Sequence, residues 1–219
     1  MKHLQKAALI VFLLIAALQV AAIDFDRMQN VISQRFGPAS VASFRDWQKL
    51  LLESADQPAP AKLKQVNDFF NRRIRFGEDQ EIWGQRDYWA TPMDTLGRGA
   101  GDCEDFAIAK YFTLLLLSIP DEKLRLIYVQ ARLGGVNSSI TQAHMVLAFY
   151  PAPDAEPLIL DNLINDLQPA SRRPDLQPVF SFNSQGLWQG ASGARGAGGP
   201  ANLSRWQELL RRARAEGFD

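Results

Sequence analysis

The sequence predicts an α+β domain in which helices pack against an antiparallel sheet. Apolar residues recur with a helical period in the first half of the chain, and short β-rich runs bounded by turn residues fill much of the second half. The chain has 219 residues, of which 47% are hydrophobic, so it can build one domain with a substantial core. This composition excludes a disordered protein.

The charge balance and the cysteine content exclude two further classes of protein. The chain has 24 Lys+Arg and 24 Asp+Glu residues, so it lacks the concentrated positive charge with which proteins bind nucleic acids. It has one cysteine, Cys103, and therefore neither an intramolecular disulfide nor a metal site built from several thiolates.

Residues 1–22 have the pattern of a signal peptide. Two lysines precede an apolar run over residues 7–20, and Val20 and Ala22 place small residues at the −3 and −1 positions of a cleavage site. The run is shorter than the roughly 20 apolar residues that a membrane span needs, which favours cleavage over an uncleaved anchor. We therefore expect an exported protein.

Helices are predicted in the first third of the mature chain. Ser40 can cap a helix whose apolar face carries Phe44 and Trp47, and a second apolar stripe runs over residues 63–74. Residues 78–101 show no regular period and predict a long loop, and such loops often carry function.

The next helix should be the central one. It is predicted to begin at Asp102, and between Phe106 and Ile119 only Lys110 is charged. A helix that is apolar on nearly all sides is buried. Pro120 ends it.

Antiparallel strands follow, and the second of them is apolar on both faces. They are predicted at Leu124–Arg132, His144–Tyr150, Leu158–Leu163 and around Val179–Asn183. We expect residues 23–190 to form this domain. Residues 191–219 are predicted to be a Gly/Ala linker and a basic C-terminal helix whose arginines face solvent.

Three residues of these elements can form a nucleophile, a base and an orienting acid. Cys103 lies in the first turn of the central helix, where free amides and the helix dipole favour a thiolate. A register that pairs Tyr150 with Ala155 places His144 opposite Asp161, and a slip of two residues keeps both on one face. This arrangement predicts a Cys103–His144–Asp161 triad.

Each of these residues also has a simpler interpretation. A lone cysteine is commonly a small buried apolar residue, a strand histidine is commonly structural, and Asp161 can start a turn with Asn162. The chain has two histidines, and the other, His3, lies in the predicted signal peptide. The combination of one thiol, one remaining histidine and an aspartate able to face it favours the triad.

Acidic residues flank the candidate nucleophile at Asp102, Glu104 and Asp105. A carboxylate about 6 Å from the thiol opposes its ionisation by roughly 3 kcal/mol at an effective dielectric constant near 20. A bound divalent cation would remove this conflict, and oxygen ligands suit calcium. Alternatively, Asp102 and Asp105 are the ordinary N-cap and N3 residues of a helix. The residues alone leave both interpretations open.

The stretch DYWATPMDTLGRGAGDCEDFAIAK at residues 87–110 resembles the bacterial transglutaminase-like cysteine proteinases, the LapG-type periplasmic proteases. The resemblance continues through residues 143–148 and 160–163 and covers most of residues 25–190. It implies a papain/transglutaminase-like fold, with the nucleophile helix packed against an antiparallel sheet. It also implies functional residues. These are the triad Cys103, His144 and Asp161, and a calcium ion held by Asp102, Glu104 and Asp105.

The resemblance implies a periplasmic, calcium-dependent cysteine endopeptidase. Members of the family cleave the N-terminal region of a large cell-surface adhesin at a dialanine site, which releases cells from biofilms. An inner-membrane cyclic-di-GMP receptor sequesters them, so a membrane is a partner only through that receptor. The alternatives are a cell-wall amidase or transglutaminase that uses the same thiol, and a non-enzymatic, calcium-stabilised binding module. Amidases usually take a second histidine as orienting residue, which the mature chain lacks.

Overall fold

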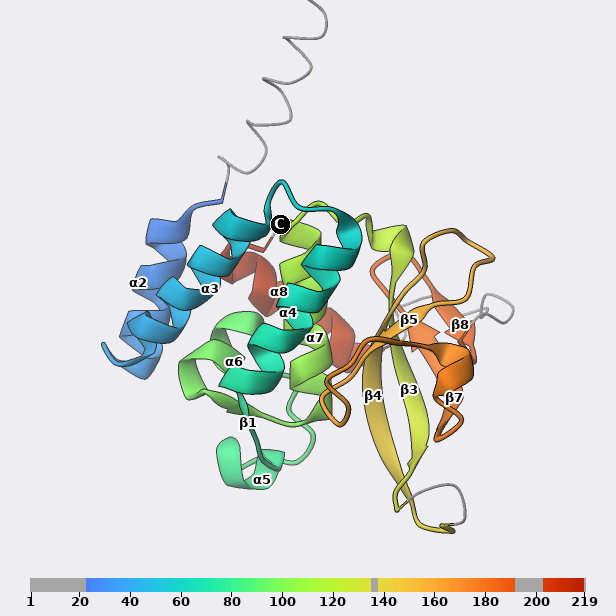
Figure 1. The fold of residues 1–219 in the computed structure, drawn as a ribbon. Coiled ribbons are helices and arrows are strands. Elements are labelled where there is room, and N and C mark those ends of the chain that lie inside the picture. Colours follow the sequence, from blue (N-terminus) through green and yellow to red (C-terminus); the bar gives the residue numbers. More distant parts are fainter. Residues whose placement is uncertain (1–22, 135–137, 192–202, 219) are drawn as a thin grey trace, which may run out of the picture.

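The computed structural model describes residues 23–134, 138–191 and 203–218 (Figure 1). The predicted signal peptide and most of the predicted Gly/Ala linker lie outside these residues. Helices gather on one side of the molecule and an antiparallel sheet forms the other, so the predicted α+β class is confirmed. None of the helices in the described ranges combines the length and apolarity that a membrane span requires.

Seven helices lie in the described ranges. In chain order they are α2 (Phe25–Phe36), α3 (Ser40–Ser54), α4 (Ala59–Arg73), α5 (Asp79–Ile82), α6 (Pro92–Arg98), α7 (Cys103–Leu116) and α8 (Ser204–Glu216). Two 3₁₀ turns, at Asp121–Lys123 and Ala170–Arg172, connect other elements.

The main sheet has six strands in the order β6-β5-β4-β3-β7-β8, and all neighbours are antiparallel. Its strands are β3 (Leu124–Arg132), β4 (Thr141–Phe149), β5 (Leu158–Leu160), β6 (Gln168–Pro169), β7 (Leu176–Phe182) and β8 (Leu187–Gln189). A separate parallel pair joins β1 (Arg75–Phe76) to β2 (Ala100–Gly101).

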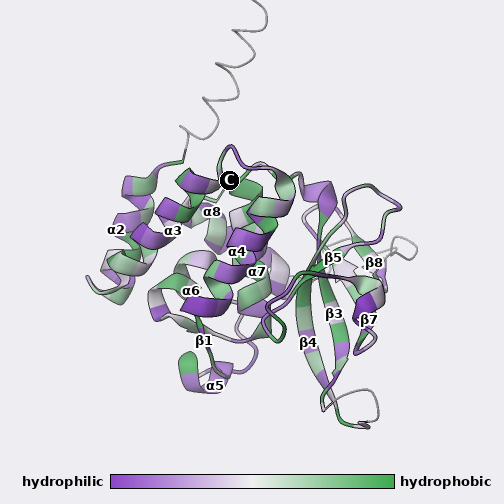
Figure 2. Ribbon diagram, in the orientation of Figure 1, coloured by the Kyte–Doolittle hydropathy of each residue, from purple (hydrophilic) through white to green (hydrophobic). Residues whose placement is uncertain are grey.

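Helix α7 is the centre of the molecule, as its composition predicts. Asp102 is its N-cap and forms a capping box with Asp105, and residues 105–114 are all buried. The helix packs on β4, α4 and α6. Figure 2 shows that β3 and β4 are mainly hydrophobic, whereas the outer helices alternate between hydrophobic and hydrophilic residues. The sheet therefore offers an apolar surface against which α7 packs.

The register of β4 and β5 differs from the predicted one by two residues. Phe149 pairs with Leu158 and Leu147 with Leu160, so the connecting loop is longer than predicted. Strand β5 also ends earlier, because the carboxylate of Asp161 accepts a hydrogen bond from the Leu163 amide and starts a turn. A slip of two residues leaves the face of each side chain unchanged.

Residues 78–101 are more regular than the predicted loop, because they contain α5, α6 and β2. Local signals define α6. Thr91 caps it with a capping box to Asp94, Pro92 is its first residue, and Gly99 ends it with a φ of +62°. A helix of seven residues is too short to show a clear period.

Two predictions about the N-terminal helices need correction. Helix α2 is not among the predicted elements, although Asp24 caps it and Met28 and Ile32 form its buried stripe. Ser40 does not cap α3, since its hydroxyl donates to the carbonyls of Ile32 and Gly37, and Ala39 is the N-cap residue.

Helix α8 shares the main core. Its Trp206 and Leu209 are fully buried, and Trp206 packs edge-on against Tyr111 of α7. Arg211 faces solvent. The prediction that the arginines of this helix face solvent is wrong for Arg212, which donates to the Asp94 carboxylate and to the Trp89 carbonyl. The composition change near residue 190 therefore separates two segments that pack into one core.

Candidate active site

Cys103 is the first residue of α7 and lines a cavity of about 610 Å³. His144 of β4 lines the same cavity, and the backbone N–H of Met145 donates toward the Cys103 sulfur. Because Met145 directly follows His144, this contact places the start of α7 beside the histidine. The aromatic side chains of Trp89, Tyr128 and Phe180 form part of the cavity wall.

His144 and Asp161 are hydrogen-bonded to one another. The distance from His144 Nε2 to Asp161 Oδ1 is 2.8 Å, and both side chains are buried. The partner of Nε2 is a carboxylate, which assigns the proton of the neutral ring to Nε2. Nδ1 is then the ring nitrogen with a free lone pair.

Asp161 is ionised in this setting. Burial opposes its charge, but the hydrogen bond from His144 and further donors lower the pKa of Asp161 to about 2. The Leu163 amide donates to Oδ1 at 3.0 Å, and Arg173 donates to Oδ2 at 2.7 Å. The Asn71 side chain of α4 also donates to the backbone carbonyl of Asp161, at 2.7 Å, and ties this segment to the helical layer.

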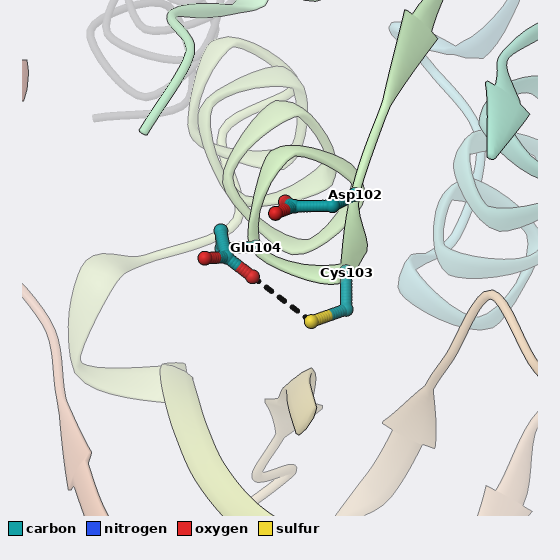
Figure 3. Close-up of side chains that lie close together, drawn as sticks. All are labelled: Asp102, Cys103 and Glu104. Atoms are coloured by element: carbon teal, nitrogen blue, oxygen red, sulfur yellow. Dashed lines mark hydrogen bonds between the residues drawn. The ribbon is translucent and has the colours of Figure 1, made fainter. Parts of the chain in front are cut away.

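The Cys103 thiol is held in its protonated form by its neighbours. Burial raises the pKa of Cys103, and the adjacent Glu104 raises it further. The thiol donates to Glu104 Oε2 over 2.9 Å, as Figure 3 shows. Burial and the acidic residues therefore outweigh the helix terminus, which alone favours a thiolate.

A second acidic group lies at the start of α7. Asp79, Asp102 and Asp105 offer oxygen atoms that all lie within 4.8 Å of one another, and Asp102, Cys103 and Glu104 form an overlapping group. The three predicted metal ligands are thus divided between the two groups, with Asp102 common to both. Asp79 is an additional member that the sequence analysis does not identify.

The small parallel strand pair brings Asp79 to this position. β1 pairs with β2, and the Gly77 amide donates to the Gly101 carbonyl, so α5 begins beside the start of α7. Gly101 is needed here because a Cβ atom would lie 2.7 Å from that of Asp105. Strand pairs of two residues leave no periodic signal, which is why Asp79 is not visible from the sequence.

The carboxylates of this group lie close to one another and are largely buried. Burial and neighbouring acids raise the pKa of Asp102 to about 10 and that of Asp105 well above its ordinary value. Burial chiefly raises the pKa of Asp79 to about 6. Asp79 Oδ2 accepts from the Tyr88 amide, whereas Oδ1 is buried without a hydrogen-bond partner among the described residues. The group is suited to a cation with oxygen ligands.

Comparisons with known proteins identify the family of this chain. The family model of the bacterial transglutaminase-like cysteine proteinases matches residues 47–175. A comparison with curated proteins gave no match. Solved structures of LapG from Legionella pneumophila are similar to this chain.

The EGTA-treated LapG structure is 38% identical, with a TM-score of 0.75 over 87% of this chain and 98% of that chain. A second LapG structure is 38% identical, with a TM-score of 0.73 over the same shares of the two chains. A calcium-bound LapG structure is 37% identical, with a TM-score of 0.73 over 87% of this chain and 99% of that chain. The chain therefore belongs to the bacterial transglutaminase-like cysteine proteinases, and it has their fold.

Proposed function

We propose that this cysteine protease is a calcium-dependent endopeptidase with Cys103 as nucleophile, His144 as general base and Asp161 as orienting acid. The observation that carries the proposal is the buried hydrogen bond between His144 and Asp161, since this histidine lines the same cavity as Cys103, the only thiol of the chain. A base that is oriented by a third group and faces a nucleophile is the general requirement for thiol catalysis.

In the proposed mechanism, Nδ1 of His144 takes the proton of Cys103 and the thiolate attacks the scissile carbonyl. The backbone N–H of Cys103, a free amide in the first turn of α7, stabilises the oxyanion. The imidazolium then protonates the leaving amine, and water hydrolyses the thioester. Asp161 holds the ring and stabilises its charged form, for which its own low pKa suits it.

We propose that Asp79, Asp102, Glu104 and Asp105 hold a calcium ion. The donor set fits such an ion, because the oxygens are hard and clustered, and a buried oxygen of Asp79 lacks a hydrogen-bond partner among the described residues. Bound there, calcium would supply the positive charge that several buried carboxylates need to be ionised together. The existence of a calcium-bound LapG supports the choice of ion.

The proposed substrate is the N-terminal region of a large cell-surface adhesin, cut at a dialanine site. We place the reaction in the periplasm, on the basis of the signal-peptide pattern of residues 1–22. We propose that an inner-membrane cyclic-di-GMP receptor controls the protease. Cleavage there would release the adhesin and promote biofilm dispersal. The assignments of the substrate and of the receptor rest on the family resemblance described above.

The test is incubation of the purified protein with the N-terminal fragment of a candidate adhesin, with calcium or with a chelator. We expect cleavage with calcium, loss of cleavage with the chelator, and none by a Cys103→Ala variant that melts at the wild-type temperature. Cleavage by that variant would refute Cys103 as nucleophile.

A primary amine added to the same reaction separates the enzyme classes. Its incorporation into the fragment would indicate a transglutaminase, whereas two fragments with free ends indicate a protease. A binding module would leave the fragment intact under every condition.

A further inference from the structure

Arg173 is a buried arginine that contacts the proposed orienting acid. Its side chain is 2% exposed, and its Nη2 donates to Asp161 Oδ2 at 2.7 Å. The other carboxylate oxygen, Oδ1, accepts from His144 and from the Leu163 amide. Each oxygen of Asp161 therefore has its own donors, and Arg173 is the side chain that holds the oxygen facing away from the imidazole.

Arg173 is itself fixed by a second carboxylate. Its Nε donates to Asp175 Oδ1 at 3.0 Å, and Nη2 donates to Asp175 Oδ2 at 2.7 Å. The residue directly follows the 3₁₀ turn Ala170–Arg172, and its backbone N–H donates to the Ala170 carbonyl. Arg173 is thus fixed at its backbone by the bond to Ala170 and at its guanidinium by the bonds to Asp175. These bonds keep the guanidinium in place if the Asp161 carboxylate rotates.

We infer that Arg173 is a positioning residue of the active site, which fixes the rotation of the Asp161 carboxylate so that Oδ1 faces His144. The torsion that turns an aspartate carboxylate is broad, so one hydrogen bond to an imidazole does not determine it. A charge-assisted bond from a clamped guanidinium to the second oxygen does. The inference rests on the proposed roles of His144 and Asp161.

A purely structural role is the competing explanation, because a buried ion pair can serve the fold alone. The two explanations differ in their effects. A structural pair affects the melting temperature, whereas a positioning residue also changes the imidazole and the chemical step. Arg172 provides a matched control, since it is the adjacent arginine, is exposed, and loses the same charge when replaced.

The experiment compares Arg173→Gln, Arg173→Lys and Arg172→Gln by two readouts. The first is kcat and KM for the adhesin fragment with calcium. The second is the ring nitrogen and proton spectrum of His144 in protein labelled with ¹⁵N-histidine, assigned with a His144→Gln variant. We expect Arg173→Gln to lower kcat by on the order of ten- to a hundredfold with little change in KM. The Nε2–H resonance should shift or broaden, and Arg173→Lys should recover part of both effects because it keeps a charged donor.

Arg172→Gln should leave kcat, KM and the resonance as in the wild type. A folded Arg173→Gln protein with wild-type kcat and an unchanged resonance would overturn the inference. If Arg173→Gln does not fold, Arg173→Lys decides. An unchanged kcat and resonance would then overturn the inference, and a lowered kcat with a shifted resonance would support it. The spectrum needs no substrate, so an inactive wild type whose resonance still responds to Arg173 would refute the proposed function and not the positioning role.

Discussion

Asp79 and Asp102 lie more than twenty positions apart in the chain, yet their carboxylate oxygens are within 4.8 Å of each other at the start of the helix that carries Cys103. The contact depends on the parallel pairing of β1 with β2, which joins the segment after α4 to the segment before α7. This relationship links the acidic group to the nucleophile helix. It makes Asp79 the most direct probe of the proposed calcium site.

Asp79→Asn should weaken calcium binding by on the order of tenfold, because it removes one negative charge from the group and replaces one of the two carboxylate oxygens of Asp79 with an amide nitrogen. Titration calorimetry of the metal-free protein with calcium measures the effect. Glu81→Gln is the matched control, since Glu81 is an exposed acid of the same short helix. Equal calcium affinities of the Asp79 variant and the wild type would exclude Asp79 as a ligand.

Calcium should stabilise the protein more at pH 7 than at pH 5. The folded-state pKa of Asp79 is raised from 3.8 to about 6, so without metal its burial costs stability as the pH rises through this window. The still higher pKa of Asp102, about 10, extends the same cost to higher pH. The melting temperature with calcium and with EGTA, recorded at both pH values, tests this. An equal calcium-induced shift at pH 5 and pH 7 would contradict it.

Glu104→Gln should increase the reactivity of Cys103 in the absence of calcium. Burial raises the pKa of the thiol first, and the charge and hydrogen bond of Glu104 raise it further. Removal of that charge should speed alkylation by iodoacetamide about tenfold. Cys103 is the only cysteine, so the mass of the intact protein reports its modification alone.

Calcium added to the wild type should have the same effect on the alkylation rate, because the ion would offset the charge of Glu104. Exposed Glu81→Gln again serves as the control. If neither calcium nor Glu104→Gln changes the alkylation rate, the acidic residues do not oppose ionisation of the Cys103 thiol and this prediction is wrong.

Lys110→Met should stabilise the protein at neutral pH. The Lys110 side chain is buried in α7, and its Nζ has no hydrogen-bond partner in the described part of the chain. Burial lowers the pKa of Lys110 to about 7, although Asp161 raises it in part. A methionine of similar length avoids the cost of burying an amine, with an expected gain of about 2 kcal/mol.

The gain has a defined pH dependence. Above the ordinary lysine pKa of 10.5 the amine is neutral in both the folded and the unfolded state. Protonation of Lys110 then has little effect on the stability of the wild type. As the pH falls from 10.5 to about 7, the unfolded state takes up a proton that the folded state resists. Denaturation of both proteins at pH 7 and pH 10 should therefore show the larger difference at pH 7. A destabilised variant at pH 7 would contradict the prediction.

The elements that the sequence predicts well are those with long apolar runs. Helix α7 and strands β3 and β4 each have many buried residues within one continuous segment. Their apolar pattern and their ends can therefore be recognised in the sequence. The placement of His144 and Asp161 on one face of the sheet is predictable from alternation, because a register error of two residues leaves both on that face.

The residues that the sequence does not reveal depend on long-range contacts. Asp79 reaches its position through strands of two residues, and Arg173 lies in an irregular segment before β7. Neither has a local pattern that distinguishes it from a surface charge. Helix α2 is a different case, because its cap at Asp24 and its buried Met28 and Ile32 are readable from the sequence.

The most direct test of the central account is the rate at which a His144→Gln variant cleaves the adhesin fragment in the presence of calcium. Glutamine keeps a polar side chain next to Asp161 but cannot take the proton of Cys103. We predict a loss of at least about a thousandfold in kcat/KM with a melting temperature close to that of the wild type. A folded variant that cleaves within tenfold of the wild-type rate would show that His144 is not the base and that the triad is wrong.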